Sequence, residues 1–167
     1  MDRMRLYLMR HGDADRTAWD GDDFDRPLTD KGRARTLAMA EHLDVIGVAP
    51  RRVLTSPLTR TVQTAMITAQ VLGGIETLVQ DERMGPYFDA VRLAQMVEDE
   101  AGGEALVLVG HEPSLSMVIS EVIGGGDVMM KKSAVACLEI YGLTDGAARA
   151  PLSGTLLWLL SPASLGF

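Results

Sequence analysis

Several residue types are scarce in this sequence, and each scarcity excludes a class of protein. The 167 residues include one cysteine, Cys137, and no asparagine, so neither an intrachain disulfide nor N-glycosylation is possible. The three histidines lie in unrelated segments and lack metal-binding spacing. We therefore expect no metal and no other cofactor. A protein without disulfides suits a reducing compartment, and we expect it in the cytoplasm.

Long apolar runs and an excess of positive charge are also missing. The first apolar run, Leu6–Met9, is too short for a signal peptide or a membrane span. The net charge of −7 argues against nucleic acid or an anionic membrane as a partner. An anionic substrate would therefore need a local basic pocket within an acidic protein.

Strand-like and helix-like patterns alternate along the chain. Strands are expected at 6–9, 52–55, 75–79, 105–109, 135–141 and 155–160, and helices at 28–43, 57–72, 89–100 and after 113. The run 105–109 has no polar alternation, which is typical of a parallel strand buried on both faces. The last two strands are expected to close one edge of the sheet in antiparallel orientation. The alternation predicts a single three-layer αβα domain over residues 1–167, with a mostly parallel sheet and helices on both faces.

Helix-capping residues and a polar loop are also recognisable. Thr29 is expected to cap the first helix, and Ser56 the second, with Pro57 at its first position. The segment 13–27 is polar and acidic and is expected to be a loop. Its aspartates at 20–25 are more typical of a solvated loop than of a metal site, and a lid that discourages highly anionic substrates is the alternative. Lys131-Lys132-Ser133 follows three glycines, but it lacks a glycine before the lysine and follows a helix, so we expect no nucleotide-binding loop there.

Three of the expected strands end in polar residues or lead into them. These residues are Arg10-His11-Gly12 after the first strand, Ser56-Pro57 and Arg60 after the second, and Gly110-His111 after the strand at 105–109. Ligands bind beyond the carboxyl ends of parallel strands, so both arginines and both histidines are expected to meet at one spot. Guanidinium groups bind phosphate bidentately, and an imidazole can attack phosphorus to form a covalent intermediate. Gly12 is expected to leave room for the transferred group.

These residues resemble the motifs of a known family. Met9-Arg10-His11-Gly12 resembles the Arg-His-Gly signature of the histidine phosphatase superfamily, also called the phosphoglycerate mutase-like family. The second and third motifs of that family are matched by Ser56-Pro57 with Arg60 and Gln63-Thr64, and by Val109-Gly110-His111. The short length of the chain resembles that of the compact SixA-type phosphohistidine phosphatases. Three of its segments resemble the same branch: Arg10–Ala14, Arg26–Thr29 with Gly32, and Ser133-Ala134.

The resemblance implies a role for each of these residues. It makes His11 the phosphate acceptor, Arg10 and Arg60 the residues that bind the phosphoryl group, and His111 a residue that contacts and stabilises it. Relatives with a glutamate after the third strand suggest Glu82 as the proton donor. Glu112, directly after His111, resembles an acid of the phytase-like branch and is the alternative donor. A substrate-assisted route stays open.

The expected function is therefore metal-independent hydrolysis of phosphohistidine on a protein, such as a phosphotransfer domain, through an intermediate on His11. One alternative is a phosphatase for a small phosphorylated metabolite that uses the same residues. Another is a module that binds a phosphorylated ligand without turnover. The presence of both histidines and both arginines speaks against the binding module.

Overall fold

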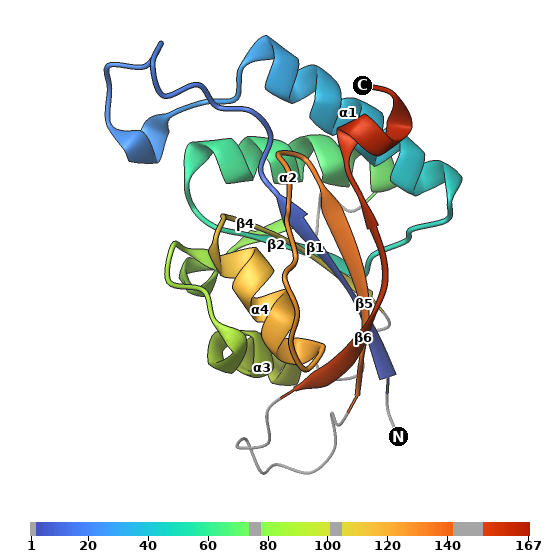
Figure 1. The fold of residues 1–167 in the computed structure, drawn as a ribbon. Coiled ribbons are helices and arrows are strands. Elements are labelled where there is room, and N and C mark those ends of the chain that lie inside the picture. The colour runs from blue at the N-terminus through green and yellow to red at the C-terminus, as the bar shows by residue number, and fades with distance from the viewer. Residues whose placement is uncertain (1–2, 74–77, 101–104, 142–151) are drawn as a thin grey trace.

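The computed structural model describes residues 3–73, 78–100, 105–141 and 152–167. Its strands are β1 (Arg3–Arg10), β2 (Arg52–Thr55), β3 (Leu78–Gln80), β4 (Ala105–Gly110), β5 (Val135–Tyr141) and β6 (Ser153–Leu160). Its α-helices are α1 (Asp30–Val45), α2 (Thr59–Leu72), α3 (Ala90–Asp99) and α4 (Ser114–Val122). Short 3-10 helices occur at Asp23–Asp25 (η1), Glu82–Met84 (η3) and Pro162–Leu165 (η4). Figure 1 shows these elements in space.

All six strands belong to one sheet with the order β3-β2-β4-β1-β5-β6. Strand β4 pairs in parallel with β1 on one side and with β2 on the other, and all its residues are buried, as predicted. Strands β5 and β6 close the edge with antiparallel pairing, which confirms that expectation. The strand expected at 75–79 begins at Leu78, and residues 74–77 lie outside the described ranges. That residues 1–167 make one domain stays a prediction.

Helices cover both faces of the sheet, so the predicted three-layer arrangement is confirmed (Figure 1). Successive side chains of a strand point to opposite faces. In β1, Leu6 and Leu8 share a buried cluster with residues of α3 and α4, such as Leu93. Tyr7 and Met9 belong to a second cluster with residues of α1 and α2, such as Met39. The central strands thus need apolar residues at every position, which explains their unbroken apolar runs.

The two predicted helix caps have different outcomes. Thr29 caps α1, with its side chain accepting a hydrogen bond from the backbone N–H of Gly32. Ser56 does not cap α2, because this helix begins at Thr59 and its N-cap is Leu58. The Ser56 hydroxyl instead lies 2.8 Å from Nε2 of His111. The local sequence pattern assigned the Ser56 hydroxyl to a helix cap, but in the structure it contacts a residue from a distant segment.

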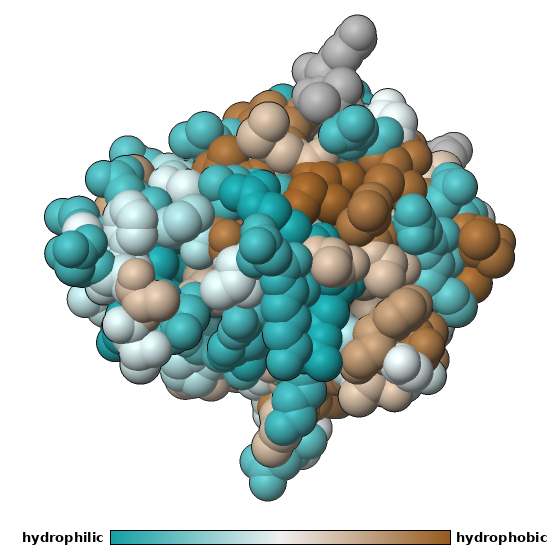
Figure 2. Space-filling view, turned by 90° about the horizontal axis from the view of Figure 1, so that it is seen from above, coloured by the Kyte–Doolittle hydropathy of each residue, from teal (hydrophilic) through white to brown (hydrophobic). Residues whose placement is uncertain are grey.

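The surface seen from above is largely hydrophilic, with an apolar area beside the hydrophilic residues (Figure 2). Among the described residues, no helix combines the length and the apolar character needed to cross a bilayer.

Candidate active site

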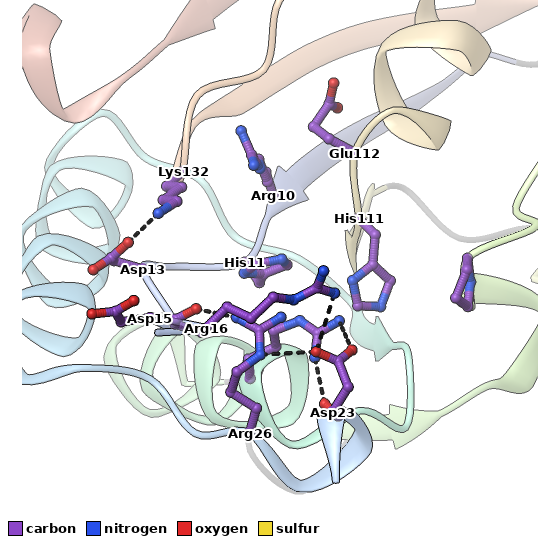
Figure 3. A pocket seen from close by; sticks show the side chains of 13 residues that line it. Arg10, His11, Asp13, Asp15, Arg16, Asp23, Arg26, His111, Glu112 and Lys132 are labelled. Atoms are coloured by element: carbon purple, nitrogen blue, oxygen red, sulfur yellow. Dashed lines mark hydrogen bonds and ion pairs between the residues drawn. The ribbon is translucent and has the colours of Figure 1, made fainter. Parts of the chain in front are cut away.

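The carboxyl ends of β1, β4 and β2 lie next to one another, as the sequence predicted. Beyond β1, the backbone N–H of His11 donates to the carbonyl of Gly110 at 3.1 Å. Beyond β2, the N–H of Ser56 donates to the carbonyl of Val109 at 3.1 Å. A cavity of about 560 Å³ opens at this edge of the sheet. Its lining includes all four residues that we expected to converge, Arg10, His11, Arg60 and His111 (Figure 3).

Gly12 follows β1 directly, and its backbone packs closely against α1. A Cβ atom at Gly12 would lie 2.6 Å from Oγ1 of Thr36 and 3.0 Å from the carbonyl oxygen of Gly32. Its N–H donates to Oγ1 of Thr64 in α2. Glycine is therefore required here by the close approach to α1, and the expectation that it makes room for a transferred group is wrong.

His11 is buried, and its hydrogen bond identifies its tautomer. Nδ1 lies 2.7 Å from the backbone carbonyl of Gly12. Because a carbonyl oxygen only accepts, Nδ1 carries the proton in neutral His11 and Nε2 keeps its lone pair. The pKa of His11 is lowered to about 3, chiefly by burial and also by the nearby His111, Arg60 and Arg10, against the opposite effect of the Gly12 carbonyl. His11 is thus a neutral imidazole with an available Nε2 at neutral pH.

His111 places a second imidazole beside the first. The ring centroids of His11 and His111 are 5.3 Å apart, with the rings inclined at 62°. Burial, followed by the charge of Arg60, lowers the pKa of His111 to about 4. Both rings are therefore uncharged when the cavity holds no anion, and the arrival of a phosphoryl dianion would raise the pKa of His111.

Hydrogen bonds fix the terminal nitrogens of the Arg10 and Arg60 side chains. Nη1 of Arg10 donates to the backbone carbonyl of Met130 at 2.9 Å. Nη1 and Nη2 of Arg60 donate to the backbone carbonyl and the carboxylate of Asp23 at 2.8 Å and 3.2 Å. The Nε atom of each arginine is buried and has no hydrogen-bond partner among the described residues. Buried donors of this kind need an acceptor, and phosphoryl oxygens would supply one for each.

The acidic loop contributes residues that the sequence reasoning missed. Asp23 in η1 lines the cavity and pairs with Arg60, with Arg26 at 3.0 Å and with Arg16 at 3.4 Å. Burial alone would raise the pKa of Asp23, but the arginine charges outweigh it and the pKa lies below its ordinary value. The residues of η1 are exposed, as expected of a solvated loop, and Asp23 among them also contributes to the site. Arg26 is nearly inaccessible, and its place in the SixA-like Arg26–Thr29 motif was the one available signal.

The other aspartates of the cavity lining are also engaged. Asp13 pairs with Lys132 and accepts a hydrogen bond from Thr29, and the bond from Lys132 is the main reason that its pKa is lowered. Asp15 accepts hydrogen bonds from the backbone and hydroxyl of Thr17, which lower its pKa. These aspartates are therefore ionised at neutral pH.

The two glutamates considered as proton donors lie differently. Glu112 lines the cavity, but its carboxylate points away from His111 (Figure 3). Both its oxygens accept from Ser116, one from the backbone N–H at 3.1 Å and one from the hydroxyl at 2.5 Å. Glu82 is exposed in η3 and does not belong to the cavity lining. The structure therefore does not bring Glu82 to the expected site, and its donor role stays a prediction without geometric support.

The arrangement suits the transfer of an anionic phosphoryl group. It combines a neutral imidazole, two anchored guanidinium groups with unpartnered donors, and a second imidazole in one cavity. In the described part of the chain, no group of three or more His, Cys, Asp or Glu side chains is arranged to hold a metal ion.

Comparisons with known proteins agree with this geometry. Residues 6–85 match the family model described as histidine phosphatase superfamily (branch 1). An uncharacterised protein of Picosynechococcus is 37% identical over 170 residues, covering 95% of this chain and 97% of the relative. The phosphohistidine phosphatase SixA of Escherichia coli K12 is 29% identical over 166 residues, covering 97% and 96% of the two chains. A solved structure of the protein histidine phosphatase SixA complexed with tungstate superposes with a TM-score of 0.84, at 27% identity, over 97% and 99% of the two chains. The chain therefore belongs to the histidine phosphatase superfamily.

Proposed function

We propose that this protein hydrolyses phosphohistidine on a phosphorylated protein, through a phosphohistidine intermediate on His11 and without a metal ion. The observation that carries the proposal is the cavity itself, which is lined both by His11, whose Nδ1 is bonded to Gly12, and by two arginines whose buried Nε donors have no partner among the described residues. Positioning and neutralisation of charge are the main demands of phosphoryl transfer. The arginines supply the positive charge that a metal ion would otherwise bring.

His11 is the nucleophile in this proposal. Its Nε2 forms a bond to phosphorus while the P–N bond to the substrate imidazole breaks. The substrate ring is protonated on its other nitrogen before the P–N bond breaks, so it leaves as neutral imidazole. Water then attacks phosphorus, the bond to His11 breaks, and the proton of the water ends on inorganic phosphate. The hydrogen bond from Nδ1 to Gly12 keeps Nε2 aimed into the cavity through both steps.

Arg10, Arg60 and His111 bind the phosphoryl group in this proposal. Asp23 and the carbonyl of Met130 hold the outer nitrogens of the two arginines. Each guanidinium can therefore offer the edge that includes Nε to the phosphoryl oxygens, in a geometry that is organised before the substrate arrives. His111 adds a ring that becomes a charged donor once the dianion raises its pKa.

The carboxyl groups favour a phosphoramidate substrate over an alkyl phosphate. An alkoxide leaving group needs a proton from a positioned acid, and such an acid must be protonated when the substrate binds. Asp13, Asp15 and Asp23 are held ionised by their hydrogen bonds, and Glu112 is turned onto Ser116. An imidazole leaving group brings its own proton, so a site with these engaged carboxylates suits phosphohistidine.

The similarity to SixA supports the same substrate class. The relative from Escherichia coli is named a phosphohistidine phosphatase, and the match spans nearly the whole of both chains. The solved relative is named a protein histidine phosphatase. We extend these names to this chain as part of the proposal, together with a place in the cytoplasm, which rests on the single cysteine.

A comparison of substrates tests the proposal. The purified protein is given a phosphohistidine peptide, an aryl phosphate and an alkyl phosphate, each with EDTA and with added Mg²⁺ or Zn²⁺. We expect the highest kcat/KM for the peptide and no effect of EDTA. Faster hydrolysis of a phosphorylated metabolite would favour the small-molecule alternative. Activity that EDTA removes and metal restores would contradict metal independence, and binding without turnover would favour the binding module.

A further inference from the structure

A second, smaller cavity lies beside the candidate active site. It has a volume of about 360 Å³ and is bordered by α1, the segment 131–132 and η4. Four cationic side chains line it: Arg10, Arg35, Lys131 and Lys132. No carboxylate side chain belongs to its lining. We call this cavity the basic recess.

The basic recess adjoins the active cavity directly. Arg10 and Lys132 line both cavities. Any molecule that reaches across Arg10 from the phosphoryl position therefore meets Arg35 and Lys131. The two cations are well placed for a substrate larger than the active cavity.

The turn that carries the two lysines is held in place relative to His11. The backbone N–H of Ser133 donates to the carbonyl of His11 at 3.2 Å, and its hydroxyl lies 3.0 Å from that of Thr36 in α1. Ser133 has a φ of 59°, a left-handed conformation that is costly for a residue other than glycine. These contacts order the turn, so that Lys131 projects from a fixed support next to the nucleophile.

Two cations of the recess lack an anionic partner. Lys132 pairs with Asp13, whereas neither Arg35 nor Lys131 forms an ion pair with another of the described residues. The chain as a whole carries a net charge of −7. Cations that cluster in an acidic protein repel one another and attract an anionic partner. A patch of this kind lets an acidic protein bind another acidic protein at one chosen place.

We propose that the basic recess binds carboxylates on the phosphorylated protein, close to its phosphohistidine. This inference rests on the proposed function. A metabolite that fits the active cavity has no need of a second basic cavity, whereas a protein that presents a phosphohistidine covers the surface around it. Lys131 is exposed and Arg35 half-buried at the rim, so both are accessible to side chains of a docked protein.

The test uses two phosphohistidine peptides of equal length, one flanked by Asp and Glu and the other by Ser and Gly. Each peptide is measured as a competitive inhibitor of aryl phosphate hydrolysis by the parent protein. Exposed ion pairs are individually weak, so we expect the acidic peptide to have a Ki about three- to tenfold lower than the neutral peptide. The difference should shrink as salt is added.

Charge-reversal variants then test whether the basic recess causes the preference for the acidic peptide. In Arg35→Glu with Lys131→Glu, the preference for the acidic peptide should disappear while kcat on the aryl phosphate is unchanged. Arg33→Glu with Arg51→Glu is the control, because it also reverses two positive charges, one of them on α1, but both residues lie outside the recess lining. The control should keep the preference.

The two proposals fail separately in this design. Equal Ki values for the two peptides in the parent, or a preference that survives in Arg35→Glu with Lys131→Glu, would overturn the recess as a binding site. Whether either peptide releases phosphate tests the proposed function. The inhibition assay reads peptide binding even if neither peptide is hydrolysed.

Discussion

Asp23 accepts two hydrogen bonds from Arg60: its backbone carbonyl lies 2.8 Å from Nη1, and its carboxylate lies 3.2 Å from Nη2. The two residues are 37 positions apart in the chain. The contact orients Arg60, and it also places a negative charge in the cavity that we assign to a phosphoryl group. Asp23 therefore has two opposed effects on an incoming anion.

Substitution of Asp23 by Asn separates these effects. The backbone carbonyl still holds Nη1 of Arg60, and the amide oxygen can still accept from Nη2, but the negative charge is lost. We expect inorganic phosphate to inhibit Asp23→Asn more strongly than the parent, with a Ki lower by about threefold or more, since one like charge is removed. Weaker inhibition by phosphate would show that the charge of Asp23 is needed to keep Arg60 in place.

Loss of the proposed nucleophile should abolish turnover. His11→Ala is expected to lower kcat by at least about 10³-fold, because a group that forms the covalent intermediate cannot be replaced by its neighbours. His42→Ala is the control, since His42 lies on α1 and is not part of the cavity lining. Rapid quenching of the parent should trap phosphate on His11 as an acid-labile, base-stable adduct. An adduct mapped to another residue would refute the assignment.

The planar guanidinium groups of Arg10 and Arg60 should both be needed for full kcat/KM. Arg10→Ala and Arg60→Ala are each expected to cost roughly 2–4 kcal/mol in kcat/KM, the range for removal of a preorganised donor. Arg60→Lys should stay well below the parent, since a compact ammonium group cannot reproduce the planar fork of the guanidinium. Full activity in Arg60→Lys would contradict the bidentate interpretation. Thermal unfolding of each variant shows whether the fold is retained.

The buried histidines should make stability depend on pH. The pKa values of His11 and His111 are lowered from 6.5 to about 3 and about 4 in the folded protein. Between pH 6.5 and pH 4 the unfolded chain therefore binds more protons, so the free energy of unfolding should fall as the pH falls. A group that is charged only in the unfolded state contributes a slope of about 1.4 kcal/mol per pH unit.

Denaturant titrations at several pH values measure that slope. His111→Gln removes one of the two groups and should flatten the slope between pH 6.5 and pH 4.5, while the slope above pH 7 stays that of the parent. The aspartates with lowered pKa values act below this window, since their ordinary value is 3.8. An unchanged slope in His111→Gln would contradict the lowered pKa of His111.

The two glutamates considered as donors should contribute little to catalysis. Glu112→Gln weakens the contacts with Ser116 and should cost about 1 kcal/mol of stability, with little change in kcat/KM on phosphohistidine. Glu82→Gln should leave the hydrolysis of every substrate near the parent rate, because Glu82 is exposed outside the cavity lining. A selective loss of alkyl phosphate hydrolysis in Glu82→Gln would instead support the donor role expected from the sequence.

The sequence by itself determined the layered fold and the meeting of four polar residues. Unbroken apolar runs encode strands that are buried on both faces, as in Ala105–Gly110. Polar residues that follow such strands meet because parallel strands end at one edge. Arg10, His11, Arg60 and His111 could therefore be predicted to converge from local patterns and one rule of topology.

Only the tertiary structure decided what those residues contact. No local pattern places Asp23 on Arg60, because the loop that carries it is polar and its position depends on how it folds back over α2. The Ser56 hydroxyl contacts His111, 55 positions away in the chain, a partner that became close only after packing. Periodicity and capping act within a few residues of the chain, whereas the pairs that shape this cavity join segments that are brought together by the closed fold.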